Sequence, residues 1–331
     1  MRDAIVVEGL TKRYGAAVAL DGLDLVVPAG TAFGLLGRNG AGKTTTVRIL
    51  TTLLRPDSGR AVVAGQDVVR QPAAVRRLIG TAGQYAALDY TLSGRENLVM
   101  FGRLHRLGRR EAARRAEAML HTFGLVEVAG RAVKTYSGGT ARRLDLAAAV
   151  IGTPSVLFLD EPSTGLDPPS RRELWDLLAD LVRGGTTLLL TTQYLEEADR
   201  LADRVAVVDH GRVIAAGTPD ELKAQVGGDR VDVRLVAAAD CARAAAALRE
   251  VALGEPVVRA AEAVVGVPAA GDASSVIAEV VRTLDRYRIP MVDISTHRPT
   301  LDDVFLTVTA AVGPPSRDTP GAAGPAGTDT G

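Results

Sequence analysis

The segment Gly37-Arg-Asn-Gly-Ala-Gly-Lys-Thr44 constrains the fold of this chain more than any other stretch. It matches the pattern G-x-x-x-x-G-K-[ST] in full, after an apolar stretch, Thr31 to Leu36, and before a helix-forming stretch, Thr44 to Leu54. Glycines let the backbone N–H groups of such a loop turn toward phosphate oxygens, and the following helix points its positive end at the same charge. Because strand, loop and helix occur in the order that the pattern requires, the sequence predicts a nucleoside triphosphate site.

The residues of this loop have distinct expected tasks. Lys43 is placed to contact the β- and γ-phosphates, and the hydroxyl of Thr44 is placed to bind Mg²⁺. The remaining residues that we expect to surround the nucleotide are Gly37, Asn39, Gly40, Ala41, Gly42 and Thr45. A chance glycine-rich turn is the alternative, and the position directly after a strand disfavours it.

Two acidic residues end a second apolar strand, Val156 to Leu159, which continues into Asp160 and Glu161. Their charges are costly to desolvate without a counter-charge, and a magnesium–nucleotide complex supplies one. Asp160 is therefore placed to hold Mg²⁺, and Glu161 to orient and polarise an attacking water. A pair of solvated acids at a strand end is the alternative, which the complete phosphate-binding loop disfavours.

The pattern of strands and helices divides the chain into two folded parts. Alternation of the two kinds of element indicates an α/β domain over residues 1–226, in which 61–83 are expected to form short strands. Residues 227–310 follow a β-α-β-β-α-β order, which predicts a small α+β domain of the split-βαβ, ferredoxin-like kind. A closing helix is expected over 301–308. Residues 311–331 are rich in Pro, Gly and Ala, and we expect them to be disordered.

Charge and hydropathy narrow the possible partners. The formal net charge is zero, so we expect no general nucleic-acid-binding surface. The first residues do not resemble a signal peptide, and no uninterrupted apolar run reaches the roughly 18 residues that a membrane-spanning helix needs. If this protein acts at a membrane, another chain must supply the path across it.

Four further motifs carry a family resemblance. Tyr136-Ser-Gly-Gly-Thr140 is similar to the signature of ABC ATPases, whose common form is L-S-G-G-Q, and Ser163-Thr-Gly-Leu-Asp167 resembles the loop after their catalytic glutamate. Gln84 stands where their glutamine loop ends a strand, and Tyr14 resembles the aromatic residue that stacks on adenine. The order of these motifs matches the ABC ATPase family over residues 4–220. The resemblance implies a P-loop ABC-type ATPase domain with a helical subdomain at about 85–150.

This resemblance also implies cofactors and a mode of assembly. ATP and Mg²⁺ are the expected cofactors, and Gln84 is expected to contact both the nucleotide and the metal. Ser137, Gly138 and Gly139 open a predicted helix, so their N–H groups form an anion site. In the family, the signature of one subunit covers the γ-phosphate held by another, which implies a head-to-tail homodimer that ATP closes.

A closer resemblance is to ATP-binding subunits of the daunorubicin-resistance type. It rests on Thr191-Thr-Gln-Tyr-Leu-Glu-Glu-Ala-Asp199 and on Leu301-Asp-Asp-Val-Phe-Leu306. It implies a subunit on the cytoplasmic face of the membrane that powers export of a drug, antibiotic or lipid-like compound through a separate permease, expected to be of the ABC-2 type. Many ABC ATPases have histidine where this chain has Gln193. We expect Gln193 to sense the γ-phosphate and Glu161 to carry the main chemical burden, because an amide cannot carry a proton.

Other functions stay open at this point. The chain could be a soluble ABC ATPase that acts on ribosomes or DNA, a nucleotide-gated protein that sequesters a drug, or a phosphotransferase. A single ATPase cassette without a coiled-coil insertion favours the transporter subunit over the first of these. The domain at 227–310 is interpreted as a regulatory or dimer-stabilising module.

Overall fold

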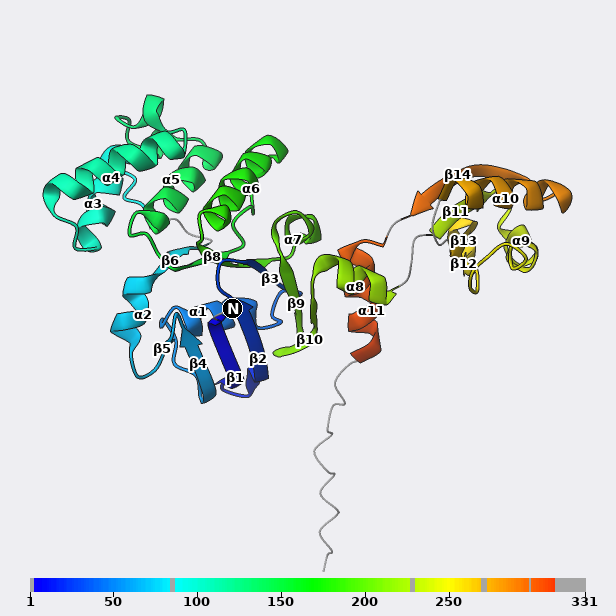
Figure 1. Cartoon of the computed structure of the whole chain (residues 1–331), viewed down its shortest axis with the longest axis horizontal. Helices are drawn as coiled ribbons and strands as arrows, with labels where there is room; N and C mark the ends of the chain where they lie inside the picture. The colour runs from blue at the N-terminus through cyan, green and yellow to red at the C-terminus, as the bar shows by residue number, and fades with distance from the viewer. Residues whose placement is uncertain (1–2, 84–86, 227–229, 269–272, 298, 313–331) are drawn as a thin grey trace, which may run out of the picture.

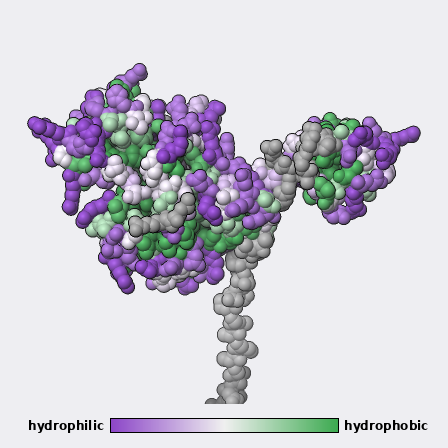
Figure 2. All heavy atoms as spheres, viewed as in Figure 1, coloured by the Kyte–Doolittle hydropathy of each residue, from purple (hydrophilic) through white to green (hydrophobic). Residues whose placement is uncertain are grey.

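The computed structural model describes residues 3–83, 87–226, 230–268, 273–297 and 299–312. Figure 1 shows a larger two-lobed domain, followed by a smaller domain and a last helix that returns to the larger one. Within the described residues, no helix is both long enough and apolar enough to cross a membrane. Hydrophilic residues cover much of the outer surface of both lobes, and hydrophobic atoms are visible in the middle of the larger domain (Figure 2).

An antiparallel sheet begins the larger domain. Its strands lie in the order β2-β1-β4-β5, with bounds Ala17–Pro28, Asp3–Tyr14, Ser58–Val63 and Gln66–Asp67. The long β1–β2 hairpin pairs Ile5 with Val27 and Val7 with Leu25, and these side chains are buried. Because alternate residues of a strand point to opposite faces, this pairing places one apolar face of the sheet against the core.

A six-stranded sheet forms the centre of the larger domain. The order is β10-β9-β3-β8-β7-β6, with bounds Arg212–Gly217, Arg204–Asp209, Ala32–Leu36, Thr187–Thr192, Val156–Asp160 and Ile79–Ala82. Strands β9, β3, β8, β7 and β6 pair in parallel, and β10 is antiparallel at the edge. All residues of β3 are buried, as expected for a parallel strand covered on both faces. The carboxyl ends of β3, β8 and β7 therefore meet at one edge.

The helices of the larger domain pack on this sheet and form the second lobe (Figure 1). Their bounds are α1 Lys43–Leu50, α2 Pro72–Leu78, α3 Gly94–Leu104, α4 Arg109–Thr122, α5 Gly138–Val150, α6 Pro168–Arg183, α7 Leu195–Leu201 and α8 Pro219–Val226. Short 3₁₀ turns lie at Val126–Val128 and Val133–Thr135. A capping box starts α3, in which Ser93 and Glu96 satisfy each other's backbone N–H groups.

The expected run of short strands over residues 61–83 is wrong in its middle. Helix α2 occupies Pro72–Leu78 and buries Val75. Proline is well tolerated in the first turn of a helix, where its missing N–H has no intrahelical partner anyway. The helix expected over 44–54 is shorter than predicted, because α1 ends at Leu50 and Thr52 has a left-handed backbone with φ of 65°.

The smaller domain has the predicted ferredoxin-like order. Its elements are β11 Arg230–Leu235, α9 Cys241–Leu248, β12 Val257–Arg259, β13 Val264–Pro268, α10 Ala273–Arg286 and β14 Met291–His297, with 3₁₀ turns at Ala238–Asp240 and Ala260–Glu262. The antiparallel sheet has the order β12-β13-β11-β14. Its core joins strand residues such as Val233 and Val265 to Leu248 of α9 and Leu284 of α10.

The last helix, α11 (Leu301–Val312), does not pack with the core of the smaller domain, although the sequence grouped it with residues 227–310. Leu301 and Val304 are buried in a cluster with Leu36, Ala198 and Leu222, all of the larger domain. The helix thus lies against α7, α8 and β10 (Figure 1). An amphipathic helix needs a covering surface, and here the larger domain provides it.

Candidate active site

The phosphate-binding loop joins the end of β3 to α1, and two of its glycines are required by the backbone. Gly42 has φ of 112°, and a Cβ there would lie 2.6 Å from the carbonyl oxygen of Ala19. A Cβ at Gly37 would lie 2.4 Å from the carbonyl oxygen of Val208. Neither approach is compatible with a side chain. The loop is therefore held tightly between β2 and β9, with Gly42 as the N-cap of α1.

Lys43 is the buried cation of this loop, with only 4% of its surface exposed. Its Nζ donates hydrogen bonds to the carbonyl oxygens of Gly37 at 2.7 Å and Arg38 at 3.2 Å. Burial lowers the pKa of Lys43, and the nearby carboxylates of Glu161 and Asp160 oppose that change. The ammonium group of Lys43 is therefore held within the loop, close to the carboxylates of Asp160 and Glu161.

Asp160 at the end of β7 meets the start of α1. Its Oδ1 accepts hydrogen bonds from the hydroxyls of Thr44 at 3.3 Å and Thr191 at 2.5 Å. A carboxylate and a hydroxyl are oxygen ligands of the kind that Mg²⁺ prefers, and Mg²⁺ is commonly bound by few protein ligands together with substrate phosphates. The residues present therefore fit a magnesium ion.

Glu161 follows Asp160 with a left-handed backbone, φ 50°, which is uncommon for a residue with a side chain. Its N–H donates to the carbonyl oxygen of Thr191 at 3.0 Å and to the Thr191 hydroxyl at 3.1 Å. Its Oε2 accepts from the hydroxyl of Thr164 at 3.2 Å. These contacts hold a conformation of a kind that costs about 1–3 kcal/mol and is concentrated at functional sites.

Gln193 follows the end of β8 and faces the phosphate-binding loop across a cavity of about 290 Å³. Residues from three separate parts of the chain line this cavity: Gly37, Arg38, Asn39, Thr192, Gln193, Leu195 and Phe305. The first three belong to the phosphate-binding loop, and Phe305 comes from α11. The predicted neighbourhood of Gln193 and the loop is therefore present, with one residue that the sequence did not place there.

The signature residues lie elsewhere, at the start of α5 in the second lobe. Ser137 is the N-cap of α5, and its Oγ accepts a hydrogen bond from the Thr140 N–H at 3.2 Å. Ser137 and Gly138 are exposed, whereas a Cβ on Gly139 would lie 2.8 Å from Ser170 Oγ. Ser137 thus caps α5 and also stands at an exposed helix N-terminus. The cavity at the phosphate-binding loop does not include them.

The other predicted nucleotide contacts differ in exposure. Tyr14 ends β1 and is 48% exposed, while Asn39 and Gly40 are exposed at the tip of the loop. Ala41 is buried and Thr45 is half-buried on α1. The prediction for Gln84 falls outside the described residues.

Some residues at this site were not singled out from the sequence. Thr191 holds both Asp160 and the Glu161 backbone, and its signal was available as a hydroxyl residue at the end of the apolar strand Thr187–Thr192. Arg142 of α5 donates to the carbonyl oxygen of Pro162 at 2.8 Å and to that of Gly83. No local pattern predicts this contact, because Arg142 is distant in sequence from both partners.

Comparison with known proteins decides the family. The model of the ABC transporter family matches residues 20–164. The daunorubicin resistance ATP-binding protein DrrA3 of Streptomyces coeruleorubidus is 56% identical over 306 residues, which cover 92% of this chain and 96% of the relative. This chain belongs to the ABC transporter family.

Two further comparisons agree with that assignment. The doxorubicin resistance ATP-binding protein DrrA of Mycobacterium tuberculosis (strain CDC 1551 / Oshkosh) is 47% identical over 311 residues, covering 92% of this chain and 93% of the relative. The structure of cbiO1 from Clostridium perfringens, part of an ABC transporter complex, has a TM-score of 0.63 at 27% identity and covers 68% of this chain and 92% of that chain. The predicted family, fold class and activity class, that of an ABC ATPase, are confirmed.

A cavity of about 260 Å³ lies between the two lobes of this ABC ATPase. One wall comes from the first lobe and includes Leu53 and Arg76, and the other includes Phe101, His105 and Asp145 of the helical lobe. Leu53 is 76% exposed, so it presents an apolar side chain at this cavity. Nearby, Leu88 is buried in the core of the helical lobe, so it is not available as an apolar docking contact.

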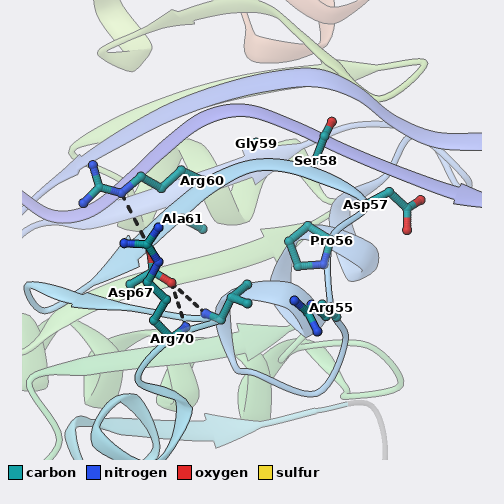
Figure 3. Close-up of a pocket in the computed structure, with 10 residues that line it drawn as sticks. Arg55, Pro56, Asp57, Ser58, Gly59, Arg60, Ala61, Asp67 and Arg70 are labelled. Carbon is teal, nitrogen blue, oxygen red and sulfur yellow. Dashed lines mark hydrogen bonds and ion pairs between the residues drawn. The ribbon is translucent and has the colours of Figure 1, made fainter.

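Another cavity, of about 500 Å³, lies on the antiparallel sheet of this ABC ATPase and shares no residue with the phosphate-binding loop (Figure 3). Arg55, Arg60 and Arg70 line it. Asp67 accepts hydrogen bonds from the N–H groups of Val69 and Arg70, both at 2.9 Å, and pairs with Arg60 at 3.7 Å. The Arg70 N–H is the main cause of the lowered pKa of Asp67. These contacts close the turn at residues 67–70. The cavity lies apart from the phosphate-binding loop, because the two share no residue.

Proposed function

We propose that this chain is the ATP-binding and ATP-hydrolysing subunit of an exporter that works with a separate membrane permease. The observation that carries the proposal is the convergence of Lys43, Thr44, Asp160 and Glu161 at one sheet edge. Asp160 bonds Thr44, Lys43 lies inside the loop, and Glu161 follows Asp160 in a strained backbone. This is the arrangement that phosphoryl transfer to water needs: a cradle, a metal site and a base.

Each residue has a separate part in hydrolysis. Loop N–H groups and Lys43 bind the phosphates. Thr44 and Asp160 would hold a magnesium ion, which would neutralise phosphate charge. Thr191 fixes both acids, because it bonds Asp160 Oδ1 and receives the Glu161 N–H. Glu161 accepts a hydrogen bond from the attacking water and orients it toward the γ-phosphorus. Gln193 donates its amide hydrogen to the γ-phosphate.

A second copy of the chain completes the site. The signature residues Ser137–Gly139 open α5 on an exposed surface, outside the cavity of their own phosphate-binding loop. An exposed helix N-terminus favours an anion, so the signature of one copy covers the γ-phosphate bound by the other. ATP thus closes a head-to-tail dimer, and hydrolysis releases it, because only the triphosphate is contacted by both copies. Tyr14 stacks on adenine at the opposite end of the nucleotide.

The permease docks in the cavity between the lobes. Leu53 and Phe101 supply apolar contacts there, and Arg76, His105 and Asp145 supply polar ones. A short amphipathic helix fits such a groove, since one face meets apolar side chains and the other stays polar. The permease is of the ABC-2 type, and the subunit lies on the cytoplasmic face of the membrane.

The cargo is a drug, an antibiotic or a lipid-like compound. This assignment follows from the relatives, which are named for daunorubicin and doxorubicin resistance and match more than nine-tenths of this chain. A nucleotide-gated sequestering protein is the second candidate, because the names of these relatives describe resistance and not transport.

Efflux measurements separate the two candidates. Cells that carry the chain together with its genomic neighbour permease should lower their content of a fluorescent anthracycline, whereas cells with either protein alone, or with Lys43→Ala and the permease, should not. Resistance conferred by the chain alone, without efflux, would contradict the transporter subunit and support sequestration.

A further inference from the structure

Helix α11 is anchored on the two elements that carry the nucleotide machinery. Its buried residues Leu301 and Val304, 2% and 1% exposed, share a cluster with Leu36, which directly precedes the phosphate-binding loop. The same cluster includes Ala198 of α7, the helix that follows Gln193, and Leu195 at the start of α7 packs against it. A helix packed on both elements fixes their separation, because well-packed interiors do not deform continuously.

The start of α11 is fixed by hydrogen bonds. The N–H of Thr300 donates to Asp303 Oδ2 at 2.9 Å, and the N–H of Asp303 donates to Thr300 Oγ1 at 3.3 Å, so each satisfies an N–H group of the first turn. His297 Nε2, at the end of β14, lies 3.1 Å from the same carboxylate oxygen. The orientation of α11 is thus set at its first turn, and with it the direction of the next side chains.

Phe305 follows Val304 and lines the cavity that Gln193 and Asn39 also line. It is half-buried, whereas its neighbour Leu306 is 67% exposed. Gln193 itself is exposed. A flexible amide that must meet a γ-phosphate gains from a wall that limits its rotamers, since ordering a long side chain costs free energy.

We propose that Phe305 is a positioning residue for hydrolysis: its ring forms the wall against which Gln193 is held toward the phosphate-binding loop. The inference rests on the role given to Gln193 in the proposed function. Phe305 comes from α11, not from the phosphate-binding loop or the strand that carries the acids. Its removal should therefore lower the rate of hydrolysis and leave ground-state binding of ATP nearly unchanged.

The test is steady-state hydrolysis of Mg·ATP by the full-length protein, with nucleotide binding measured in parallel. Phe305→Ala should lower kcat about tenfold with KM within about twofold of wild type. Phe305→Leu, which keeps apolar bulk, should give an intermediate kcat. Leu306→Ala is the matched control on the same helix and should behave like wild type. Wild-type kcat in both Phe305 variants overturns the inference, and if Phe305→Ala does not fold, Phe305→Leu decides by the same criterion.

A double-mutant cycle tests the link to Gln193. In a Gln193→Ala background, Phe305→Ala should cause no further loss of kcat, because the amide that the ring positions is gone. Equal fold losses in both backgrounds contradict the inference and indicate a general structural role. These outcomes are distinct from failure of the proposed function, which shows as absence of Mg·ATP hydrolysis in the wild-type protein.

Discussion

Arg142 Nη1 lies 3.3 Å from Asp145 Oδ2, one turn further along α5, and the two residues together hold both sides of the glutamine loop. Arg142 donates to the Gly83 carbonyl, and Asp145 Oδ1 accepts from the Ala87 N–H at 3.3 Å. Arg142 also reaches the carbonyl of Pro162, directly after Glu161. The helix that begins with the signature therefore contacts the segments that flank two other predicted site residues, Gln84 and Glu161.

Asp145 makes stability depend on pH. Burial raises the pKa of Asp145 to about 6, against the opposing effects of Arg142 and the Ala87 N–H. The folded state then binds a proton more tightly than the unfolded state, so this group's contribution to the free energy of unfolding is largest at low pH and falls as pH rises toward 6. Asp145→Asn removes this pH-dependent contribution to the free energy of unfolding. We expect the stability of the variant relative to wild type to increase by about 1 kcal/mol between pH 5 and pH 7.

Urea denaturation at several pH values checks this prediction. Arg142 keeps a polar partner in Asp145→Asn. Asp57→Asn is the control: the pKa of this exposed acid is lowered, so it stays ionised from pH 5 to pH 7 and its difference from wild type should not change in this range. A stability difference between Asp145→Asn and wild type that stays constant from pH 5 to pH 7 contradicts the raised pKa.

The Trp175 indole is a buried donor that links α6 to α7. Its Nε1 donates to Glu197 Oε1 at 3.1 Å, and both residues are buried. Trp175→Phe leaves a buried acceptor without its donor, so it should cost about 1–3 kcal/mol of unfolding free energy, measured by circular dichroism in denaturant. Glu197→Gln keeps the acceptor oxygen and removes the carboxyl group, whose pKa burial already raises. It should cost less than Trp175→Phe; the reverse order would refute this assignment.

Lys43 should govern nucleotide affinity. Lys43→Ala removes a charge-assisted contact to phosphate, worth about 1.5–3 kcal/mol, so binding of a fluorescent ATP analogue should weaken roughly ten- to a hundredfold. Lys223→Ala, which removes a surface lysine paired with Asp199, provides the matched control and should bind normally. Unchanged affinity in Lys43→Ala would remove this lysine from the phosphate site.

Packing of α11 on the larger domain can be measured directly. Leu301→Ala opens a cavity against Leu36 and Leu222 and should lower the free energy of unfolding by about 2–4 kcal/mol. Leu306→Ala, at an exposed position of the same helix, should change it by less than about 0.5 kcal/mol. Equal effects of the two substitutions would mean that α11 does not pack there in solution.

The phosphate-binding loop and the acids were predictable because their signals are local. A glycine pattern between strand and helix defines the cradle, and an apolar strand that ends in Asp160 and Glu161 places the acids at the same sheet edge. The ferredoxin-like order of the smaller domain was predictable for the same reason, since each strand and helix has its own periodicity.

Contacts between distant segments were not predictable. The spacing of Leu301, Val304 and Val308 predicts a helix with one apolar face, but it does not say which surface covers that face. The left-handed backbone of Glu161 and the link from Arg142 to Gly83 depend on tertiary packing in the same way. One practical consequence concerns α11: a deletion of residues 227–310, the range that the sequence assigns to the second domain, would also remove most of α11 from the larger domain.

Hydrolysis and binding of Mg·ATP by Glu161→Gln, compared with wild type, test the assigned chemistry most directly. The variant keeps the side-chain shape and the cradle, but its amide is a poor base. It should bind Mg·ATP like wild type and form a more stable dimer, while its hydrolysis rate falls by roughly 10²–10⁴-fold. Two results would contradict this assignment: hydrolysis by Glu161→Gln at the wild-type rate, or a folded wild-type protein that does not bind Mg·ATP.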